Sequence, residues 1–224
     1  MNGFQNDLQL GNGIYTVPDL ALILHLPQHK VRRWLTDFYD ERLGKSYEGK
    51  YSWGEGRERA TNFLTLIEFY VFYILREQKM SADKILKAHI HMSKDLKTPY
   101  PFASYKLLVN KKQILYGLDE DRWIHADESK QIVIHEIIQD FFQKIDFSSN
   151  ELAKRFWPLG KEHSIVVDPH HQFGQAVIHG TNINAATIYS MHKSGESLST
   201  IGILYDLTEE QMNDAIAFCK RKAA

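Results

Sequence analysis

The sequence holds a single cysteine, Cys219, among 224 residues. One cysteine excludes a disulfide scaffold and a zinc cluster built on cysteine ligands, and it is typical of a reducing cytoplasm. An excess of charge of one sign is also missing, because 27 Lys and Arg face 28 Asp and Glu and leave a net charge of −1. This balance excludes a generally basic protein that coats nucleic acid, so any contact with DNA has to come from a local patch.

Long hydrophobic runs are missing as well. The densest apolar stretch, 63–75, is preceded by Asn62, interrupted by Glu68 and followed by Arg76, so it is too short and too polar to span a membrane. The first residues, 1–13, have neither the basic start nor the apolar centre of a signal peptide. We therefore expect a soluble, cytoplasmic protein.

Apolar residues make up 43% and charged residues 25% of the chain, which is the composition of an ordinary globular protein with a buried core. A chain of this length forms one large domain or two small ones. The pattern of helices, turns and strands predicts a mainly α fold with small β hairpins. It divides the chain into 1–104, an N-terminal winged helix-turn-helix-like and helical domain, 105–160, a mixed α/β connecting region, and 161–224, a small three-helix, helix-turn-helix-like domain with a short β pair.

The first block begins with two short amphipathic helices. Pro18 is suited to the first turn of a helix, and Pro27 interrupts the pattern in a turn of about three residues, 25–27. In the second helix the apolar residues recur with helical spacing at Val31, Trp34, Leu35 and Phe38. Two such helices joined by a tight turn are typical of the helix-turn-helix motif.

The glycine-punctuated, aromatic segment 44–56 follows, and it predicts a short hairpin rather than a helix. Beyond it, 62–78 is an apolar helix with so few polar positions that it forms either the core of this block or half of a dimer interface. Because the stretch 63–75 is apolar on more than one face, we expect a homodimer. Ser81 is suited to cap the next helix, 82–91.

In the second and third blocks, turns separate short strands and helices. The expected elements are a hairpin at 105–116, a helix at 130–142, a strand pair at 143–147 and 152–157, a turn at 157–160, strands at 165–167 and 175–178, and helices at 185–193, 198–205 and 209–222. Gly195 lies where the first of these last three helices ends. Thr208 and Gln211 have the spacing of a capping box at the start of the last one.

The second helix of the first block is the strongest candidate for a contact with nucleic acid. Its face opposite the apolar residues is cationic, and Arg and Lys side chains recognise guanine edges and phosphates. The segment after it adds cations and aromatic rings that can lie against a sugar-phosphate backbone. The predicted DNA-contacting residues are His29, Lys30, Arg32, Arg33, Thr36, Lys50, Tyr51, Trp53 and Arg57. Eight basic and six acidic residues between 28 and 59 leave a net charge of only +2, so the solvated face of a packing helix is the alternative.

The sequence contains no recognisable metal-binding or catalytic motif. His170 and His171, with His163 and His179 nearby, are the most suggestive cluster, but neither cysteine nor an ordered acidic spacing completes a tetrahedral site. Acidic clusters such as 119–121 lie in turns or at helix starts, where they solvate a loop or complement a helix dipole. The GxSxG, P-loop and GxGxxG motifs are missing too. We therefore expect no enzymatic activity, no metal and no cofactor.

Two parts of the sequence resemble known families. The start of the chain resembles the winged helix-turn-helix of MerR-type regulators in 13–21 (GIYTVPDLA), 26–27 (LP) and 31–35 (VRRWL). The third block resembles the family of domains of unknown function 433 (DUF433), described as predicted antitoxins of toxin–antitoxin pairs. Its matching segments are, in order, 165–169, 173–175, 177–181, 195–197 and 205–208. Three further segments resemble the longer members of that family, namely 63–68, 101–104 and 157–160.

The chain departs from the family pattern at two positions. Asn182 follows the Gly-Thr pair where the family usually has Arg, which removes the basis for a charged contact there. Ala176 lies where a Pro is common. The strand and helix patterns on both sides of these positions are retained, so the expected fold is unaffected.

The resemblance implies a DNA-binding antitoxin that represses its own operon and neutralises a PIN-like ribonuclease toxin by direct binding. Its homodimer would read a palindromic operator in double-stranded DNA. The alternative is a stand-alone, MerR-like regulator that responds to a ligand, with 63–75, Trp123 and Trp157 lining the effector pocket. A third class, a metal-dependent nuclease, needs clustered carboxylates that the sequence does not offer.

Overall fold

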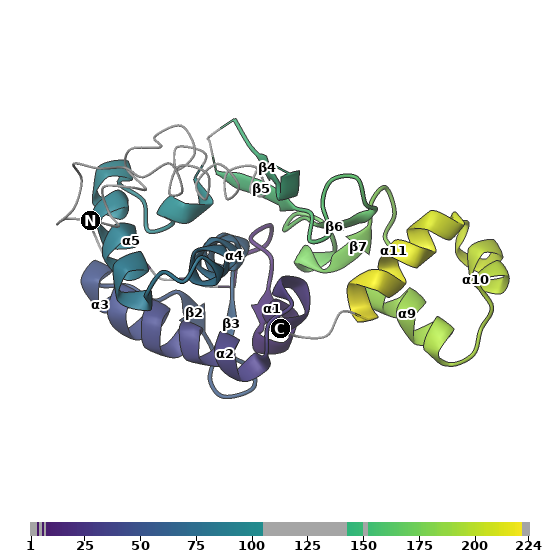
Figure 1. The fold of residues 1–224 in the computed structure, drawn as a ribbon, viewed down its shortest axis with the longest axis horizontal. Helices are drawn as coiled ribbons and strands as arrows, with labels where there is room; N and C mark the ends of the chain where they lie inside the picture. Colours follow the sequence, from purple (N-terminus) through teal and green to yellow (C-terminus); the bar gives the residue numbers. More distant parts are fainter. Residues whose placement is uncertain (1–3, 5, 7, 105–142, 150–151, 221–224) are drawn as a thin grey trace.

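Helices and two small antiparallel sheets make up the computed structural model, which describes residues 4, 6, 8–104, 143–149 and 152–220 (Figure 1). This confirms the mainly α class with small β elements. The hairpin expected at 105–116 and the helix expected at 130–142 lie outside the described residues. Among the described helices, none combines the length and the apolar character that crossing a membrane requires.

The chain enters the fold through β1 (Tyr15–Thr16) and α1 (Val17–Leu24). A capping box begins α1, because the Thr16 N–H donates to the Asp19 carboxylate at 2.9 Å and the Asp19 N–H donates back to the Thr16 hydroxyl at 3.4 Å. His25, in the left-handed conformation with φ 61°, ends the helix. The second short helix, α2 (Gln28–Arg33), therefore starts after a turn of three residues, as the sequence predicts.

Helix α2 continues without interruption into η1 (Trp34–Leu43), a π-helical stretch, and α3 (Gly44–Tyr47). The expectation that the segment starting at Gly44 is not helical is therefore wrong for its first four residues. The buried side chains of Leu43 and Tyr47 hold this turn on the core. A Cβ on Gly44 would lie 2.5 Å from the carbonyl oxygen of Gly49, so glycine lets the returning loop approach closely.

The predicted hairpin forms a few residues later, from β2 (Ser52–Trp53) and β3 (Ala60–Thr61). Strand β3 pairs antiparallel with both β2 and β1, which gives a three-stranded sheet in the order β1-β3-β2. The loop 54–59 joins β2 to β3 and projects from the sheet (Figure 1).

Helix α4 (Phe63–Glu77) is the centre of the N-terminal half and packs near α5 (Ala82–Leu96) and the short 3₁₀ turn η2 (Pro101–Ala103). The Asn62 side chain caps α4, and the Ser81 hydroxyl caps α5 as predicted, by accepting the Lys84 N–H at 3.3 Å. Most of α4 is buried within its own chain. The helix therefore forms core rather than a dimer seam, and a homodimer has to use another surface.

The second sheet contains four antiparallel strands in chain order: β4 (Ile145–Phe147), β5 (Ala153–Phe156), β6 (Ile165–Val167) and β7 (Ala176–Ile178). The two predicted strand pairs are both present. They also join each other, because Phe156 of β5 lies opposite Val167 of β6. One sheet thus crosses the boundary expected at 160/161, and η3 (Gln172–Gly174) connects its last two strands.

The chain ends in α9 (Ala185–Lys193), α10 (Leu198–Tyr205) and α11 (Glu209–Lys220). Gly195, with φ +97°, follows the end of α9, and the predicted capping box is formed by Thr208 and Gln211 at 3.0 and 3.2 Å. Helices α9 and α11 pack against each other and against β7 and β6. Helix α10 lies at the end of the molecule opposite α3 and α5 (Figure 1). One hydrophobic core runs from the N-terminal sheet to α11.

Candidate nucleic-acid interface

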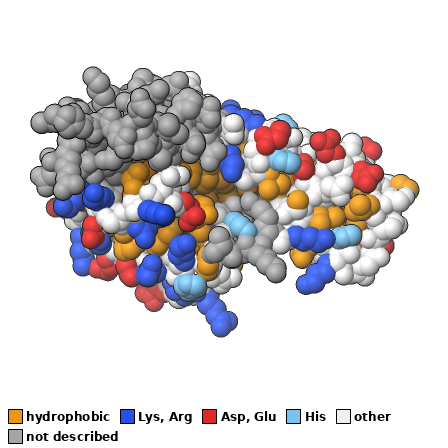
Figure 2. All heavy atoms as spheres, in the orientation of Figure 1, with side chains coloured by type: hydrophobic (Ala, Val, Ile, Leu, Met, Phe, Trp, Pro, Cys, Tyr) orange, Lys and Arg blue, Asp and Glu red, His pale blue; other side chains and the backbone are white. Residues whose placement is uncertain are grey.

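Helix α2 separates an apolar face from a cationic one. Val31 is fully buried and Trp34 is 1% exposed, and the Trp34 ring lies edge-on to Phe72 of α4 at 4.8 Å between centroids. His29, Arg32 and Arg33 are exposed on the opposite side. Figure 2 shows Lys, Arg and His side chains along the lower edge of the molecule, where Figure 1 places α2. The structure therefore brings these three predicted residues together on one face.

Two other predicted residues, Lys30 of α2 and Thr36 of η1, interact within the fold. The Lys30 ammonium group lies 5.7 Å from the centroid of Trp34 and 5.8 Å from that of Tyr73, which are cation–π distances. The Thr36 hydroxyl has two acceptors within hydrogen-bond distance, the carbonyl of Arg32 at 3.0 Å and the Asp37 carboxylate at 2.8 Å. Thr36 is therefore engaged along its own helix rather than presented as a free donor.

The predicted residues of the hairpin region differ in exposure. Arg57 is exposed in the loop between β2 and β3, next to Gly56, which has the left-handed φ of +55°. Lys50 is exposed just before β2, and Trp53 is half-buried. The loop 54–59 extends from the same lower edge of the molecule as α2 (Figure 1).

Tyr51 is not a surface residue, so its expected contact with DNA is wrong. Its side chain is 0% exposed, and its hydroxyl donates to the carbonyl of Pro99 at 2.7 Å. Its ring packs edge-on against Tyr39 at 5.1 Å. Burial raises the pKa of Tyr51 well above its ordinary value, helped by the charge of Glu68. The ring fills the space between η1 and the segment after α5. The sequence around Tyr51 gives no sign of these distant contacts.

A half-buried carboxylate, Asp40 of η1, fixes the hairpin to the continuous helical segment 28–47. It accepts the backbone N–H of Tyr51 at 2.9 Å and that of Ser52 at 3.1 Å, and it also accepts the Ser52 hydroxyl. The guanidinium of Arg59 lies 3.3 Å from the same carboxylate. Sequence reasoning missed this role, because an acidic residue in a helix gives no sign of partners 11 to 19 positions away.

Acidic residues near the predicted cations limit the size of the cationic surface. Lys45 and Glu41 form an exposed i,i+4 ion pair at 2.5 Å, and the hydrogen bond and charge of Lys45 lower the pKa of Glu41. Glu55 and Glu58 are exposed in the same loop as Arg57. The DNA-facing candidate is therefore the exposed face of α2 with the loop of Arg57 along the same edge, whereas Lys50 lies beside the N-terminal segment, bonded through its backbone to Phe4 and Asn6.

The histidines of the third block each contact a different partner in the fold. His163 Nδ1 lies 2.8 Å from the Asp214 carboxylate of α11, and His171 Nε2 lies 3.0 Å from the carbonyl of Thr181. The His179 ring stacks edge-on against Trp157 at 5.0 Å. Across the described part of the chain, no three His, Cys, Asp or Glu residues gather as a metal site would need.

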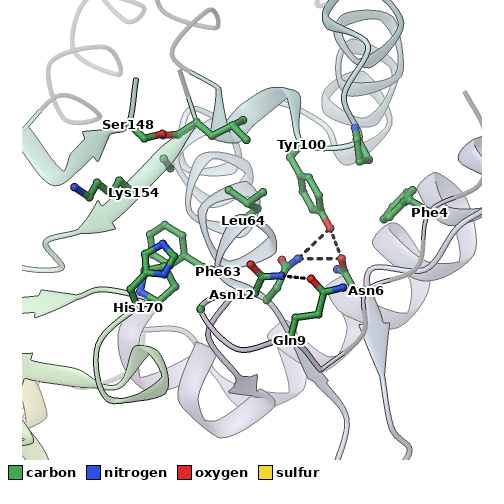
Figure 3. A pocket seen from close by; sticks show the side chains of 16 residues that line it. Phe4, Asn6, Gln9, Asn12, Phe63, Leu64, Tyr100, Ser148, Lys154 and His170 are labelled. Atoms are coloured by element: carbon green, nitrogen blue, oxygen red, sulfur yellow. Dashed lines mark hydrogen bonds between the residues drawn. The ribbon is translucent and has the colours of Figure 1, made fainter. Parts of the chain in front are cut away.

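A cleft of about 410 Å³ lies between the N-terminal segment and the β4–β5 end of the second sheet (Figure 3). Its polar floor is an internal network, since the Asn62 amide donates to Asn6 at 2.9 Å and to the Tyr100 hydroxyl at 3.1 Å. Trp157, expected beside the apolar helix in an effector pocket, packs instead with Val166 and Val177. The other expected ring, Trp123, lies outside the described residues.

A known protein sequence and a solved structure are similar to this chain over nearly its whole length. The sequence is 22% identical to "Putative antitoxin VapB45" of Mycobacterium tuberculosis, over 94% of this chain and 95% of that protein. The fold matches the crystal structure of Rv2018 from Mycobacterium tuberculosis with a TM-score of 0.71 and 19% identity, over 94% of this chain and 99% of that one. The family model described as "Protein of unknown function (DUF433)" matches residues 165–219, which contain β6, β7 and the last three helices. The segment 165–219 therefore matches the DUF433 family model, as the C-terminal motifs of the sequence predict.

Proposed function

We propose that this chain is a non-enzymatic, cytoplasmic antitoxin that binds DNA through α2. The observation that carries the proposal is the division of that helix: Val31 and Trp34 anchor it in the core while His29, Arg32 and Arg33 remain exposed. A short helix fixed by its apolar face, with cations on the other, is the arrangement in which a recognition helix enters the major groove.

Four exposed cations have a definite role in the proposal. Arg32 and Arg33 reach base edges, where a guanidinium can pair with guanine through two hydrogen bonds. Lys50 and Arg57 neutralise phosphates beside the groove. Thr36 and Tyr51 are left out, because their hydroxyls already bond within the protein. Two copies reading a palindrome would give the operator specificity that one short helix cannot.

The second half of the proposal concerns the toxin. Similarity over nearly the full length of a protein named as an antitoxin supports an antitoxin role for this chain. We propose that it neutralises a PIN-like ribonuclease by covering it, and that it represses its own operon through α2.

A gel-shift titration with the promoter of its own operon tests the DNA-binding half. We expect R32A/R33A to weaken binding by at least about 30-fold, because a good Arg–guanine pair contributes about 1–3 kcal/mol. The matched control is K84A/K87A, which removes two exposed cations from α5 instead. Equal affinities of the two double variants would show that α2 does not read DNA.

A further inference from the structure

Helix α10 turns large aliphatic side chains toward solvent. Ile203 is 84% exposed and Leu204 is 62% exposed, whereas Ile201 on the inner side is fully buried. The eight residues of the helix, LSTIGILY, include no charged side chain. A contiguous exposed apolar patch that is rimmed by polar residues marks an interaction site in soluble proteins.

The chain segment that contains α10 carries charge of a single sign, and the exposed Lys193 at the end of α9 is the basic residue that precedes it. Between Ser194 and Asp214 the sequence contains no Lys, Arg or His. Four exposed carboxylates border the helix on both sides in the chain: Glu196, Asp206, Glu209 and Glu210. Figure 2 shows orange side chains at the end of the molecule where α10 lies, with red side chains above them and blue and pale-blue ones below, on the side of α9 and α11. A second copy of this surface would bring acidic rims together, whereas a partner with a basic rim would be attracted.

The position of α10 is fixed before any partner arrives. The Ser197 hydroxyl accepts the Thr200 N–H at 3.0 Å at its start, and the Leu207 N–H bonds to the Gly202 carbonyl at 3.1 Å at its end. A Cβ on Gly202 would lie 3.1 Å from the Leu207 carbonyl oxygen and 3.2 Å from the Met212 side chain, so the helix lies close against the start of α11. A helix held in this way loses little conformational freedom on binding.

We propose that α10 is the docking helix for a protein partner whose surface offers an apolar groove bordered by Lys and Arg. Ile203 and Leu204 insert into the groove, and the four carboxylates face its rim, in the mode of a helix recognised by its apolar face. The inference rests on the proposed function, because it assigns this surface to the toxin. It also separates two tasks in space, with DNA at α2 and the toxin at the far end of the molecule.

Co-expression of the tagged full chain with the untagged product of the neighbouring reading frame tests the proposal. The wild type should retain that product, and I203E/L204E should weaken the complex by at least about 30-fold, as expected for residues at the centre of an interface. The matched control is Leu10→Glu, which changes an exposed leucine far from α10 in the sequence and should leave the complex intact. E209Q/E210Q should reduce the salt dependence of association.

Two further measurements make each outcome decisive. A circular dichroism spectrum and a urea midpoint close to those of the wild type show that I203E/L204E is folded, whether or not the chain binds DNA. If this variant still retains the neighbouring product, α10 is not the docking helix, although the proposed function stands. If the wild type retains nothing, the toxin-binding half of the proposed function fails and the inference fails with it. If light scattering shows a wild-type dimer that I203E/L204E converts into a monomer, a second copy covers the face and the proposal is overturned.

Discussion

Glu68 of α4 and His89 of α5 face each other in the core, with Oε2 of the carboxylate 2.9 Å from Nε2 of the imidazole and both side chains fully buried. The other carboxylate oxygen accepts the N–H groups of Phe102 at 2.8 Å and Ala103 at 3.2 Å. His89 Nδ1 lies 3.0 Å from the hydroxyl of Tyr47, the last residue of α3. The segments 63–68 and 101–104, which resemble the longer members of the DUF433 family, therefore meet at this carboxylate.

Replacing Glu68 with Ala should destabilise the N-terminal half severely. The change removes the acceptor of two buried N–H groups and leaves His89 without the carboxylate that faces it, and each buried polar group left unsatisfied costs about 1–3 kcal/mol. Denaturant unfolding followed by circular dichroism measures the change in free energy. Glu77→Ala, at the exposed C-terminal end of the same helix, is the control and should stay within about 0.5 kcal/mol of the wild type.

Alkaline conditions should unfold the protein through its buried tyrosines. Burial raises the pKa of Tyr39 and Tyr15 well above the ordinary value, and burial raises that of Tyr100 to about 12. In the unfolded chain these phenols lose their protons near pH 10, so the stability they contribute is complete below about pH 10 and falls as the pH rises toward the folded value. Tyr100 alone accounts for a loss of the order of 2–3 kcal/mol between about pH 10 and 12.

Urea midpoints measured at successive pH values, with the phenolate absorbance followed in parallel, check this expectation. Tyr100→Phe has no phenol to ionise at that position, so its stability should fall less steeply above about pH 10 than that of the wild type. Identical slopes for the two proteins would show that Tyr100 ionises equally easily when folded and unfolded.

Asp40 should control the mobility of the hairpin loop. Its carboxylate accepts the N–H groups of Tyr51 and Ser52, so Asp40→Ala leaves both donors without their acceptor and frees Arg59. Hydrogen bonds to charged groups contribute about 1.5–3 kcal/mol each, and we expect the loop 54–59 to open more often. Limited trypsin digestion should then cut after Arg57 at least about 10-fold faster. Asp37→Ala, which removes an exposed carboxylate three residues earlier, should leave the rate of this cleavage unchanged.

Elements that are stabilised by residues close together in the sequence could be predicted. The three-residue turn before α2, the serine cap of α5 and the Thr208–Gln211 capping box all depend on residues within a few positions of one another. The cationic face of α2 follows from helical spacing in the same way. These interactions form wherever the local pattern is present, so no knowledge of the tertiary fold is needed.

Features that depend on distant partners could not be predicted. Tyr51 is buried because it bonds to Pro99, 48 positions away, and the second sheet has four strands because Phe156 pairs with Val167 across a turn. The apolar helix α4 has the same composition whether its own chain or a second copy covers it, and only the fold shows that its own chain does so. The acidic rim of α10 could be read from the sequence, but the exposure of Ile203 could not.

Arg57 and Arg32 should affect DNA binding in different ways, because the proposed interface assigns one to phosphate and the other to a base edge. Arg57→Ala should weaken binding about equally for all sequences and lower the slope of log K against log salt by about 1, as expected when one phosphate contact is lost. Arg32→Ala should cost about 1–3 kcal/mol on the operator and relax the preference at one base pair. Fluorescence anisotropy at several salt concentrations, with the operator and with a scrambled duplex of the same length, separates the two effects. If Arg57→Ala changed the preference between these duplexes, the hairpin loop would be reading bases and α2 would not be the only recognition element.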